Sequence, residues 1–329
     1  MSNPRSDTIV FNASVSNNTN EAKKLQFSEF RNQNILDKAE DYYVRVFESK
    51  IPVMAVPFFR MLPNDMSVTI NGIRVFLVPI QLNPVNGAVV YIYYIQQFLD
   101  SLNAALTQAH LLNGYLSSPP VMVYDYDNDL LNFVIDVQYY GDGSNPIQIC
   151  FNTKLMYKLT GFMNSFTFGA IPGQEYTIRY ASYAQNHLFP GGTLFNINYD
   201  AIFMPSQAKY YKDLLEYQSI ILTTRALKVN EQYISRGNGD NSSLPILAEI
   251  PISFEELNSS KYLTFSQLYP KWTALNTHGN LRAIDLNAYF VGDDFEINDV
   301  FILSGQKFNV RLEFINKSLV RNYLPEIVV

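Results

Sequence analysis

Residues 281–291 read LRAIDLNAYFV, and this stretch decides the fold. Within it the apolar residues Ile284 and Leu286 alternate with the polar residues Asp285 and Asn287. Successive side chains of a β-strand point to opposite faces, so a period of two places apolar residues on one face and polar residues on the other. One buried face and one polar face are typical of a strand in an antiparallel β-sandwich.

Similar stretches, rich in β-branched and aromatic residues, recur along the chain between turn residues. They read YYVRVFES (42–49), SVTINGIRVFLVPIQ (67–81), VMVYDYDNDLLNFVIDVQYY (121–140), IQICF (147–151), YTIRYA (176–181), TLFNINYDAIF (193–203), YQSIILTTRALKV (217–229), LPILAEIPI (244–252) and KFNVRLEFI (307–315). Asn71-Gly72, inside the second stretch, predicts a hairpin turn. Many short strands favour an all-β sandwich, because an alternating β/α fold needs a helix between most strands.

One principal helix is predicted over residues 95–109, where apolar residues recur at steps of three and four and Asn113-Gly114 supplies a stop. A shorter helix is predicted over residues 153–159, closed by Gly161. The fold class is therefore all-β, a sandwich with insertions and one principal helix.

The chain is expected to divide into three parts. Residues 1–40 are rich in Asn and Ser and have weak periodicity, which predicts an extended N-terminal arm. Residues 41–316 form the sandwich domain, with a helix-containing insertion at about 90–205. Residues 317–329 form a C-terminal tail that, like the arm, is expected to reach neighbouring subunits.

The composition predicts an obligate assembly. Hydrophobic residues make up 47% of the chain and aromatic residues 14%, whereas charged residues make up only 16%. Charged residues are usually about a quarter of a globular domain, and they keep exposed surfaces apart. A chain with so few charges has apolar surface to cover against a partner.

The charge and cysteine content exclude several classes of protein. A net charge of −6, with balanced charges over residues 1–40, makes nucleic acid an unexpected partner. Cys150 is the single cysteine, so neither an intrachain disulfide nor a cysteine metal cage can form. No stretch has the run of about 18 apolar residues that a membrane span needs, and no signal peptide is evident, so synthesis in a reducing cytoplasm is expected.

An acidic stretch, DYDND over residues 125–129, resembles the start of a calcium-binding EF-hand loop, with Asp136 at the twelfth position. That loop needs glycine at its sixth position, where this chain has Leu130, and it needs flanking helices rather than strands. The stretch therefore predicts a hydrated hairpin turn and no metal site.

Histidine and cysteine give no catalytic pattern. His110, His187 and His278 are far apart in sequence, and each is interpreted as a surface or packing residue. Cys150 lies in the apolar stretch IQICF and is interpreted as a buried, inert thiol. No phosphate-binding loop or serine-hydrolase motif is present, so no catalytic, cofactor-binding or metal-binding residue is assigned.

Paired acidic residues and loop glycines are the remaining candidates for functional sites. Asp293-Asp294 and Glu255-Glu256 are carboxylate pairs, but neighbours in sequence usually point apart, whereas glycosidases need two facing carboxylates. Gly191-Gly192 and the glycines of Gly141-Asp142-Gly143 are interpreted as turn residues with positive φ.

Clustered tyrosines suggest either a stacking platform for bases or sugars, or a protein interface. The groups are Tyr42-Tyr43, Tyr91 to Tyr94, Tyr139-Tyr140 and Tyr210-Tyr211. Tyrosine gives a large contact area at small entropic cost, and the chain is acidic, so the core and interface interpretation is preferred.

The last hundred residues carry a recurrent pattern of strand and turn residues. They are Leu244-Pro245, Tyr269-Pro270, Leu281, Arg282, Ile284, Asp285, Leu286, Gly305 and 311–314. Through these residues the chain resembles the closing half of the minor capsid, or penton, proteins of virophages and polinton-like viruses. The likeness is good over about a third of the chain and rests on packing patterns, which are less specific than a catalytic motif.

The resemblance implies that the sandwich is a jelly roll and that the chain forms homopentamers at icosahedral fivefold vertices. It also implies a neighbouring partner, the double jelly-roll major capsid protein, and localisation in a virion assembled in the host cytoplasm or a virus factory. The function implied is structural and not enzymatic, without a cofactor. Two alternatives stay open: a jelly-roll carbohydrate-binding or host-attachment protein, and a sandwich hydrolase with a carboxylate pair.

Overall fold

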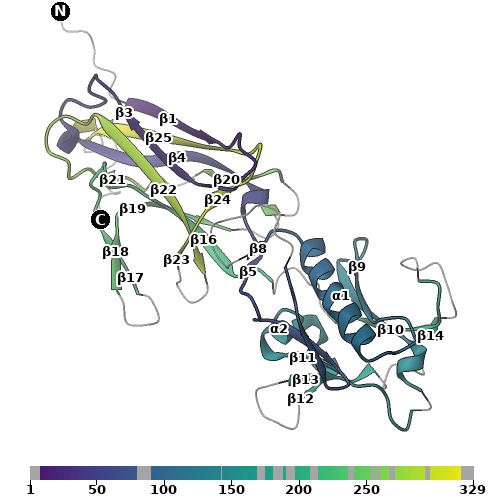
Figure 1. Ribbon diagram of the computed structural model, residues 1–329. Helices are drawn as coiled ribbons and strands as arrows, with labels where there is room; N and C mark the ends of the chain where they lie inside the picture. The colour runs from purple at the N-terminus through teal and green to yellow at the C-terminus, as the bar shows by residue number, and fades with distance from the viewer. Residues whose placement is uncertain are drawn as a thin grey trace, which may run out of the picture. The chain divides into compact units, whose positions relative to one another are not determined.

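The chain folds into two units. The computed structural model describes residues 8–79, 90–141, 143–168, 175–180, 188–189, 197–207, 214–235, 241–252, 256–257, 260–266, 271–292 and 297–319. The first unit comprises Met1–Val56 and Glu216–Val329, and the second comprises Pro57–Leu215 (Figure 1). The second unit is therefore an insertion into the sequence of the first.

Eight strands form two antiparallel sheets in the first unit. They are β1 (Thr8–Ser16), β3 (Gln26–Phe30), β4 (Tyr42–Pro52), β16 (Tyr217–Thr223), β19 (Ile246–Pro251), β20 (Tyr262–Ser266), β22 (Ala283–Gly292) and β25 (Lys307–Asn316). One sheet has the order β1-β25-β4-β20 and the other the order β3-β22-β16-β19. With the eight strands numbered in chain order, these sheets run 1-8-3-6 and 2-7-4-5, which is the double Greek-key order of a jelly roll. The predicted jelly-roll sandwich is confirmed.

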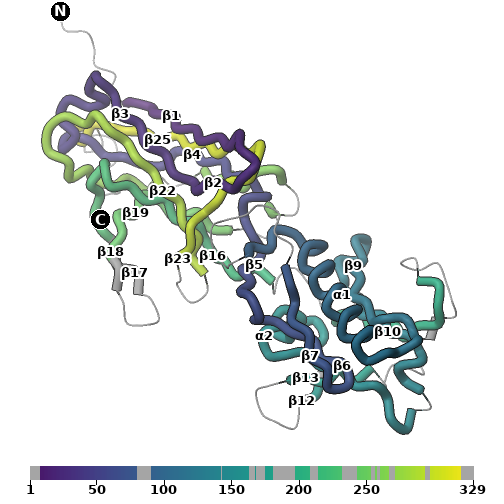
Figure 2. The backbone as a smooth tube through the Cα atoms, in the orientation of Figure 1, coloured from purple at the N-terminus to yellow at the C-terminus, as the bar shows by residue number. Residues whose placement is uncertain are grey.

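Short strands complete the first unit. They are β2 (Lys23–Lys24) with β24 (Phe301–Ile302), β17 (Gln232–Ser235) with β18 (Asn241–Leu244), β21 (Thr273–Ala274) beside β4, and β23 (Ile297–Asp299) beside β22. Figure 2 shows the purple β1 and the yellow β25 side by side, so the first and last main strands of the chain are neighbours.

The core of the jelly roll follows from alternating sequence patterns. In β22 the residues Ile284, Leu286, Ala288 and Phe290 are at most 1% exposed, as the alternation in residues 281–291 predicts. The opposite sheet buries Phe308, Val310, Leu312 and Phe314 of β25. The ring of Phe11 in β1 meets the ring of Phe27 in β3 edge to face at 5.9 Å, which joins the two sheets.

A β-bulge at Phe47 keeps both halves of β4 facing this core. Arg311 lies opposite Glu48 and Leu312 lies opposite Val46, so Phe47 has no partner on β25. An extra residue shifts the alternation by one, which is why Val46 before the bulge and Ser49 after it are both buried.

The predicted arm over residues 1–40 is wrong for the residues that the structure describes. Residues 8–16 form β1, which is paired with β25 in register along its whole length, and residues 26–30 form β3. The strand signal is the alternation of Phe11, Ala13 and Val15 with polar residues, which the high Asn and Ser content obscures. Of the predicted tail, Lys317 donates to the backbone carbonyl of Glu40 at 2.6 Å, and residues from 320 onward lie outside the described ranges.

The second unit packs two sheets and one long helix. The sheets have the orders β12-β13-β11-β6-β7 and β14-β15-β10-β9. Their strands are β6 (Ser67–Ile70), β7 (Ile73–Phe76), β9 (Val121–Asp125), β10 (Leu130–Asp136), β11 (Ile149–Asn152), β12 (Phe166–Phe168), β13 (Glu175–Ile178), β14 (Leu188–Phe189) and β15 (Ala201–Pro205), and a separate pair is β5 (Phe59–Met61) with β8 (Val90–Ile92). Short 3-10 helices lie at Ala39–Asp41 and Val53–Ala55 in the first unit, and at Val137–Tyr139 and Thr160–Ser165 in the second.

The predicted helices and hairpin are confirmed in this unit. Helix α1 (Ile95–Leu112) contacts β6, β7 and β9, and its buried residue Phe98 meets Phe59 edge to face at 5.4 Å. Helix α2 spans Thr153–Tyr157. Asn71 and Gly72 both have positive φ, 44° and 86°, as a two-residue type I′ hairpin turn requires.

The insertion is larger than predicted. It spans residues 57–215 and not about 90–205, because the β6-β7 hairpin pairs with β11 and so belongs to the second unit. The sequence of this hairpin has the same strand pattern as the jelly-roll strands, and only its long-range pairing reveals where it belongs.

Asn17 joins two loops at one end of the jelly roll. Its side chain is fully buried, and its amide nitrogen donates to the carbonyls of Glu21 at 2.7 Å and Ile302 at 2.8 Å. Its backbone N–H donates to the carbonyl of Gln306 at 3.0 Å, and its carbonyl accepts from Gly305 at 2.8 Å. One residue therefore holds the turn after β1 against the turn before β25.

We expect Asn17→Ala to lower the free energy of unfolding by about 2 to 3 kcal/mol, because it leaves the buried carbonyl of Ile302 without its donor. Urea denaturation of the full chain measures this. Asn18→Ala, at the exposed neighbouring position, is the control and should change little. Equal effects of the two variants would contradict the role of Asn17.

Candidate assembly surface

The outward face of the sheet β1-β25-β4-β20 carries a group of charged and aromatic side chains, which we name the outer-sheet cluster. It consists of Arg45, Phe47, Glu48, Trp272, Arg311 and Glu313. In β4 and β25 these residues occupy positions between the buried ones, so the alternation that builds the core also builds this face.

Arg45 is the centre of the cluster. It lies opposite Glu313 across β4 and β25, and its Nε donates to the Glu313 carboxylate at 2.6 Å. The guanidinium group lies over the ring of Trp272 at 4.6 Å and over the ring of Phe47 at 5.0 Å. The side chains of Arg45 and Glu313 are only 13% and 18% exposed, so the ion pair is shielded and holds one geometry.

Arg311 extends the cluster toward β1. Its guanidinium lies 5.8 Å from the ring centre of Phe47 and 3.7 Å from the Glu48 carboxylate, and its Nε donates to Asn12 Oδ1 at 3.0 Å. A hydrogen bond from Lys50 lowers the pKa of Glu48. The charges of this face are thus largely paired with one another, which leaves a surface of fixed shape.

A shallow groove of about 270 Å³ crosses this face and is lined in part by Asn12, Ser14, Lys50 and Arg311. Sites for drug-sized molecules usually have volumes of about 300 to 1,000 Å³, so this groove lies below the usual range. The face therefore suits contact with a protein surface better than capture of a small ligand.

A second surface lies on α1 of the inserted unit. Leu111 and Leu112 are each more than half exposed, and beside them a groove runs along Ala104 and Thr107. Exposed leucines gathered in one place are typical of a contact surface.

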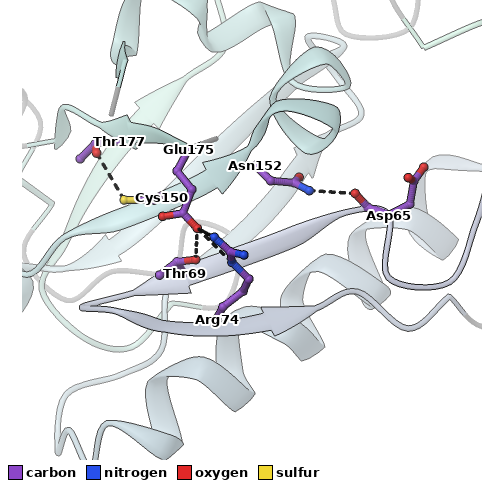
Figure 3. A network of polar contacts seen from close by, with 7 residues as sticks. All are labelled: Asp65, Thr69, Arg74, Cys150, Asn152, Glu175 and Thr177. Carbon is purple, nitrogen blue, oxygen red and sulfur yellow. Dashed lines mark hydrogen bonds and ion pairs between the residues drawn. The ribbon is translucent and has the colours of Figure 1, made fainter. Parts of the chain in front are cut away.

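A polar network in the inserted unit ties its strands together (Figure 3). One carboxylate oxygen of Glu175 in β13 accepts from Thr69 Oγ1 at 2.7 Å and from Arg74 Nη2 at 2.6 Å. The Asn152 side chain donates to the Asp65 carbonyl at 2.8 Å and caps α2 by accepting from Leu155 N. These bonds link β13 and β11 to the β6-β7 hairpin and its approach, and they are structural.

The predicted burial of Cys150 is confirmed. It lies in β11 with its sulfur 3.3 Å from Thr177 Oγ1, and burial raises the pKa of the thiol (Figure 3). A raised pKa keeps the thiol protonated at neutral pH, which is unfavourable for a nucleophile.

His110 is a packing residue, as predicted. It is 2% exposed at the end of α1, and its Nδ1 lies 2.6 Å from the hydroxyl of Tyr139, whose ring stacks on the imidazole. Burial lowers the pKa of His110, against smaller raising effects of the Ser117 carbonyl and of Asp136. His278 is exposed, and His187 lies outside the described residues.

The acidic stretch forms the predicted hairpin turn between β9 and β10. One oxygen of Asp125 accepts from the backbone N–H groups of Asp127 at 3.0 Å and Asn128 at 3.2 Å, and the Asn128 side chain lowers the pKa of Asp125. The carboxylate thus closes the turn on itself. Among the described residues no group of three His, Cys, Asp or Glu side chains is placed to hold a metal ion.

The tyrosine groups lie in different places. Tyr43 is in β4 of the jelly roll, whereas Tyr94 and Tyr139 lie near opposite ends of α1 in the inserted unit, about 24 Å apart along the helix. Tyr139 is fully buried. Within the inserted unit Tyr94 and Tyr139 therefore do not share one platform, and Tyr210-Tyr211 lie outside the described residues.

The structure describes some of the loop glycines and carboxylate pairs singled out in the sequence. Gly141 and Gly143 have φ of 58° and 81°, which confirms their interpretation as turn residues. Glu255, Asp293-Asp294 and Gly191-Gly192 lie outside the described residues, so the carboxylate pairs stay untested.

Comparison with known proteins finds similarity in structure and none in sequence. No protein-family model matches the chain, and no curated protein matches it significantly. A chain in the 3.5 Å cryo-EM structure of the Sputnik virophage is similar with a TM-score of 0.68 and 18% identity, over 96% of this chain and 99% of that one. The mavirus penton protein is similar with a TM-score of 0.58 and 17% identity, over 94% of this chain and 99% of that one.

The chain shares its fold with these two virophage proteins. The jelly-roll unit alone is about half of the chain, so a match over nearly the whole length includes the inserted unit as well. The resemblance to penton proteins noted in the last hundred residues is thereby confirmed at the level of fold.

The burial of His110 predicts a pH-dependent stability. Because the pKa of His110 is lowered in the folded chain, the unfolded chain binds more protons once the pH falls below about 6.5, and stability decreases with acidification. We expect the urea concentration at the unfolding midpoint to decrease as the pH is lowered from about 7.5 to about 5.5. This range lies above the pH at which carboxylates titrate. His110→Gln should remove most of this pH dependence, whereas the control His278→Gln should not. If the urea midpoint of His110→Gln depended on pH as strongly as that of the unchanged chain, the role of His110 would be contradicted.

Because the ion pair of Arg45 with Glu313 is shielded from water, we expect a measurable coupling energy between the two side chains. In a double-mutant cycle with Arg45→Met and Glu313→Gln, we expect a coupling energy of about 1 to 2 kcal/mol in urea denaturation. The more exposed pair Arg31–Glu29, 2.5 Å apart, is the control and should give about 0.5 kcal/mol or less. Equal coupling in both pairs would show that the outer-sheet cluster is not preorganised.

Proposed function

We propose that this chain is a structural capsid protein that forms homopentameric capsomers at the fivefold vertices of an icosahedral virus. The observation that carries the proposal is the likeness to the mavirus penton protein over 94% of this chain and 99% of that one. The role is architectural and not catalytic, and its partners are further copies of the chain and a double jelly-roll major capsid protein.

The physical character of the chain supports an assembly role. Charged residues are only 16% of the sequence, and both described contact surfaces carry few unpaired charges. A cyclic pentamer needs two different patches that meet when one copy is rotated by a fifth of a turn. The jelly roll and the inserted unit each supply an exposed surface for such contacts.

The expected location is the virion, with assembly in the host cytoplasm or a virus factory. The net charge of −6 supports contacts with protein rather than with nucleic acid. No helix in the described parts of the chain is long and apolar enough to cross a membrane.

Negative-stain electron microscopy of the purified full chain tests the proposal directly. We expect rings of five subunits, alone or after addition of the major capsid protein, because the sparse charge favours self-association. Sedimentation over a range of concentrations supplies the subunit number. A chain that stays strictly monomeric at high concentration, with and without the major capsid protein, would contradict the proposed function.

A further inference from the structure

The two sheets of the jelly roll differ in how their edges are protected. The edge strand β3 carries Glu29, which is paired with Arg31 just beyond the end of the strand. The other edge of that sheet, β19, carries Glu249 and ends at Pro251. Charges and prolines on edge strands prevent pairing with another chain. Both edges of the β3-β22-β16-β19 sheet are therefore protected against further strands.

The sheet β1-β25-β4-β20 lacks this protection at both edges. The sequences of β1, TIVFNASVS, and of β20, YLTFS, contain no charged residue and no proline. In the described part of the chain no strand pairs with the outer side of either β1 or β20. An uncharged and regular edge is a template for an added strand.

Elsewhere the chain does close an uncovered edge. Strand β9 ends its sheet in the inserted unit, and Asn103 of α1 covers it: the Asn103 amide donates to the Met122 carbonyl at 2.9 Å and accepts from the Met122 N–H at 2.7 Å. A side-chain amide there takes the place of a neighbouring strand. The open edges of the jelly roll contrast with this arrangement.

The ladder fixes which backbone groups of β1 point outward. Asn17 N–H donates to Gln306 opposite it, and the pairs alternate between bonded and non-bonded along an antiparallel ladder. Every second residue before Asn17 therefore bonds to β25 through its backbone N–H and C=O groups. These residues are Phe11, Ala13 and Val15. The N–H groups of Val10, Asn12 and Ser14 therefore point to the open edge.

The ladder between β4 and β20 likewise fixes which backbone groups of β20 point outward. Val53 N–H donates to the Lys261 carbonyl at 3.1 Å, and these residues continue the register of β4 with β20. By alternation, the N–H groups of Tyr262, Thr264 and Ser266 point away from β4. Both edges thus present regularly spaced donors and acceptors.

The directions of the strands decide how the two edges can meet. β1 is antiparallel to β25, β25 to β4, and β4 to β20, so β1 and β20 run in opposite directions. A second copy rotated about an axis along the strands brings its β20 beside β1 in an antiparallel arrangement. The pairing uses two different edges, as a closed ring requires.

We propose that β20 of one copy pairs with β1 of the next copy, so that the β1-β25-β4-β20 sheets join edge to edge around the ring. The proposal deepens the proposed function and depends on it. A β1–β1 pair would instead join only two copies and leave both β20 edges open.

Proline substitutions at outward N–H positions test the pairing. Ser14→Pro and Thr264→Pro each remove one donor that points to the open edge and none that bonds within the sheet. We expect each to raise the protein concentration needed for half assembly by about tenfold or more. Ser14→Ala and Thr264→Ala keep the N–H and are the matched controls, for which we expect assembly like that of the unchanged chain.

Hydrogen exchange on the unchanged chain gives an independent measurement. The amides of Asn12, Ser14 and Thr264 should exchange more slowly in the assembled form than at dilutions that give subunits. Thermal unfolding of the dilute proline variants shows whether the subunit stays folded, so that a folding defect is not mistaken for lost pairing.

Failure of the edge pairing and failure of the proposed function give different outcomes. If both proline variants form rings like the unchanged chain, and the edge amides exchange as fast in the rings as in the subunits, the edge pairing is overturned. The proposed pentamer is then unaffected. Sensitivity to Ser14→Pro alone would overturn β20 as the partner of β1. An unchanged chain that never assembles would overturn the proposed function and the edge pairing together.

Discussion

The pairing of β1 with β25 is the contact on which the rest of the structure depends. Nine consecutive residues of the first main strand lie in register with the last, almost 300 residues later in the chain. Closing so long a loop costs conformational entropy, and the buried faces of the two strands offset that cost, with Phe11 on β1 and Phe308 and Leu312 on β25 fully or almost fully buried. Asn17 then fixes the end of the ladder by joining the two adjoining turns.

This closure explains why an insertion of about half the chain is tolerated. The insertion leaves β4 and returns at β16, which are the third and fourth strands of the jelly roll and lie in different sheets. Neither sheet needs a short connection at that point, and the inserted unit has its own core of α1 packed against β6, β7 and β9. Loop-closure entropy grows only slowly with length, so the main requirement is that the insertion buries its own apolar surface.

Local patterns in the sequence predicted individual strands, helices and turns. Features that depend on pairing between distant segments could not be predicted from such patterns. Strand β22, helix α1 and the Asn71-Gly72 turn were predicted because each is specified by residues close together in the chain. The prediction of an extended N-terminal arm was wrong, because the strand pattern of β1 lies within an Asn- and Ser-rich stretch. The outer-sheet cluster was not foreseen: Arg45 and Glu313 are 268 residues apart, and the only signal was a charged residue at an outward position in each strand.

The distribution of charge along the jelly roll bears on the proposed edge pairing. The sequence has few charges, and on the outer sheet they occupy the middle strands β4 and β25, where Arg45, Glu313, Arg311 and Glu48 pair with one another. The edge strands β1 and β20 have none. A charge on an edge must lose water when a second strand arrives, whereas backbone N–H and C=O groups exchange water for new partners at little net cost. A sheet built to join others edge to edge should therefore keep its charges in the centre, and this sheet does.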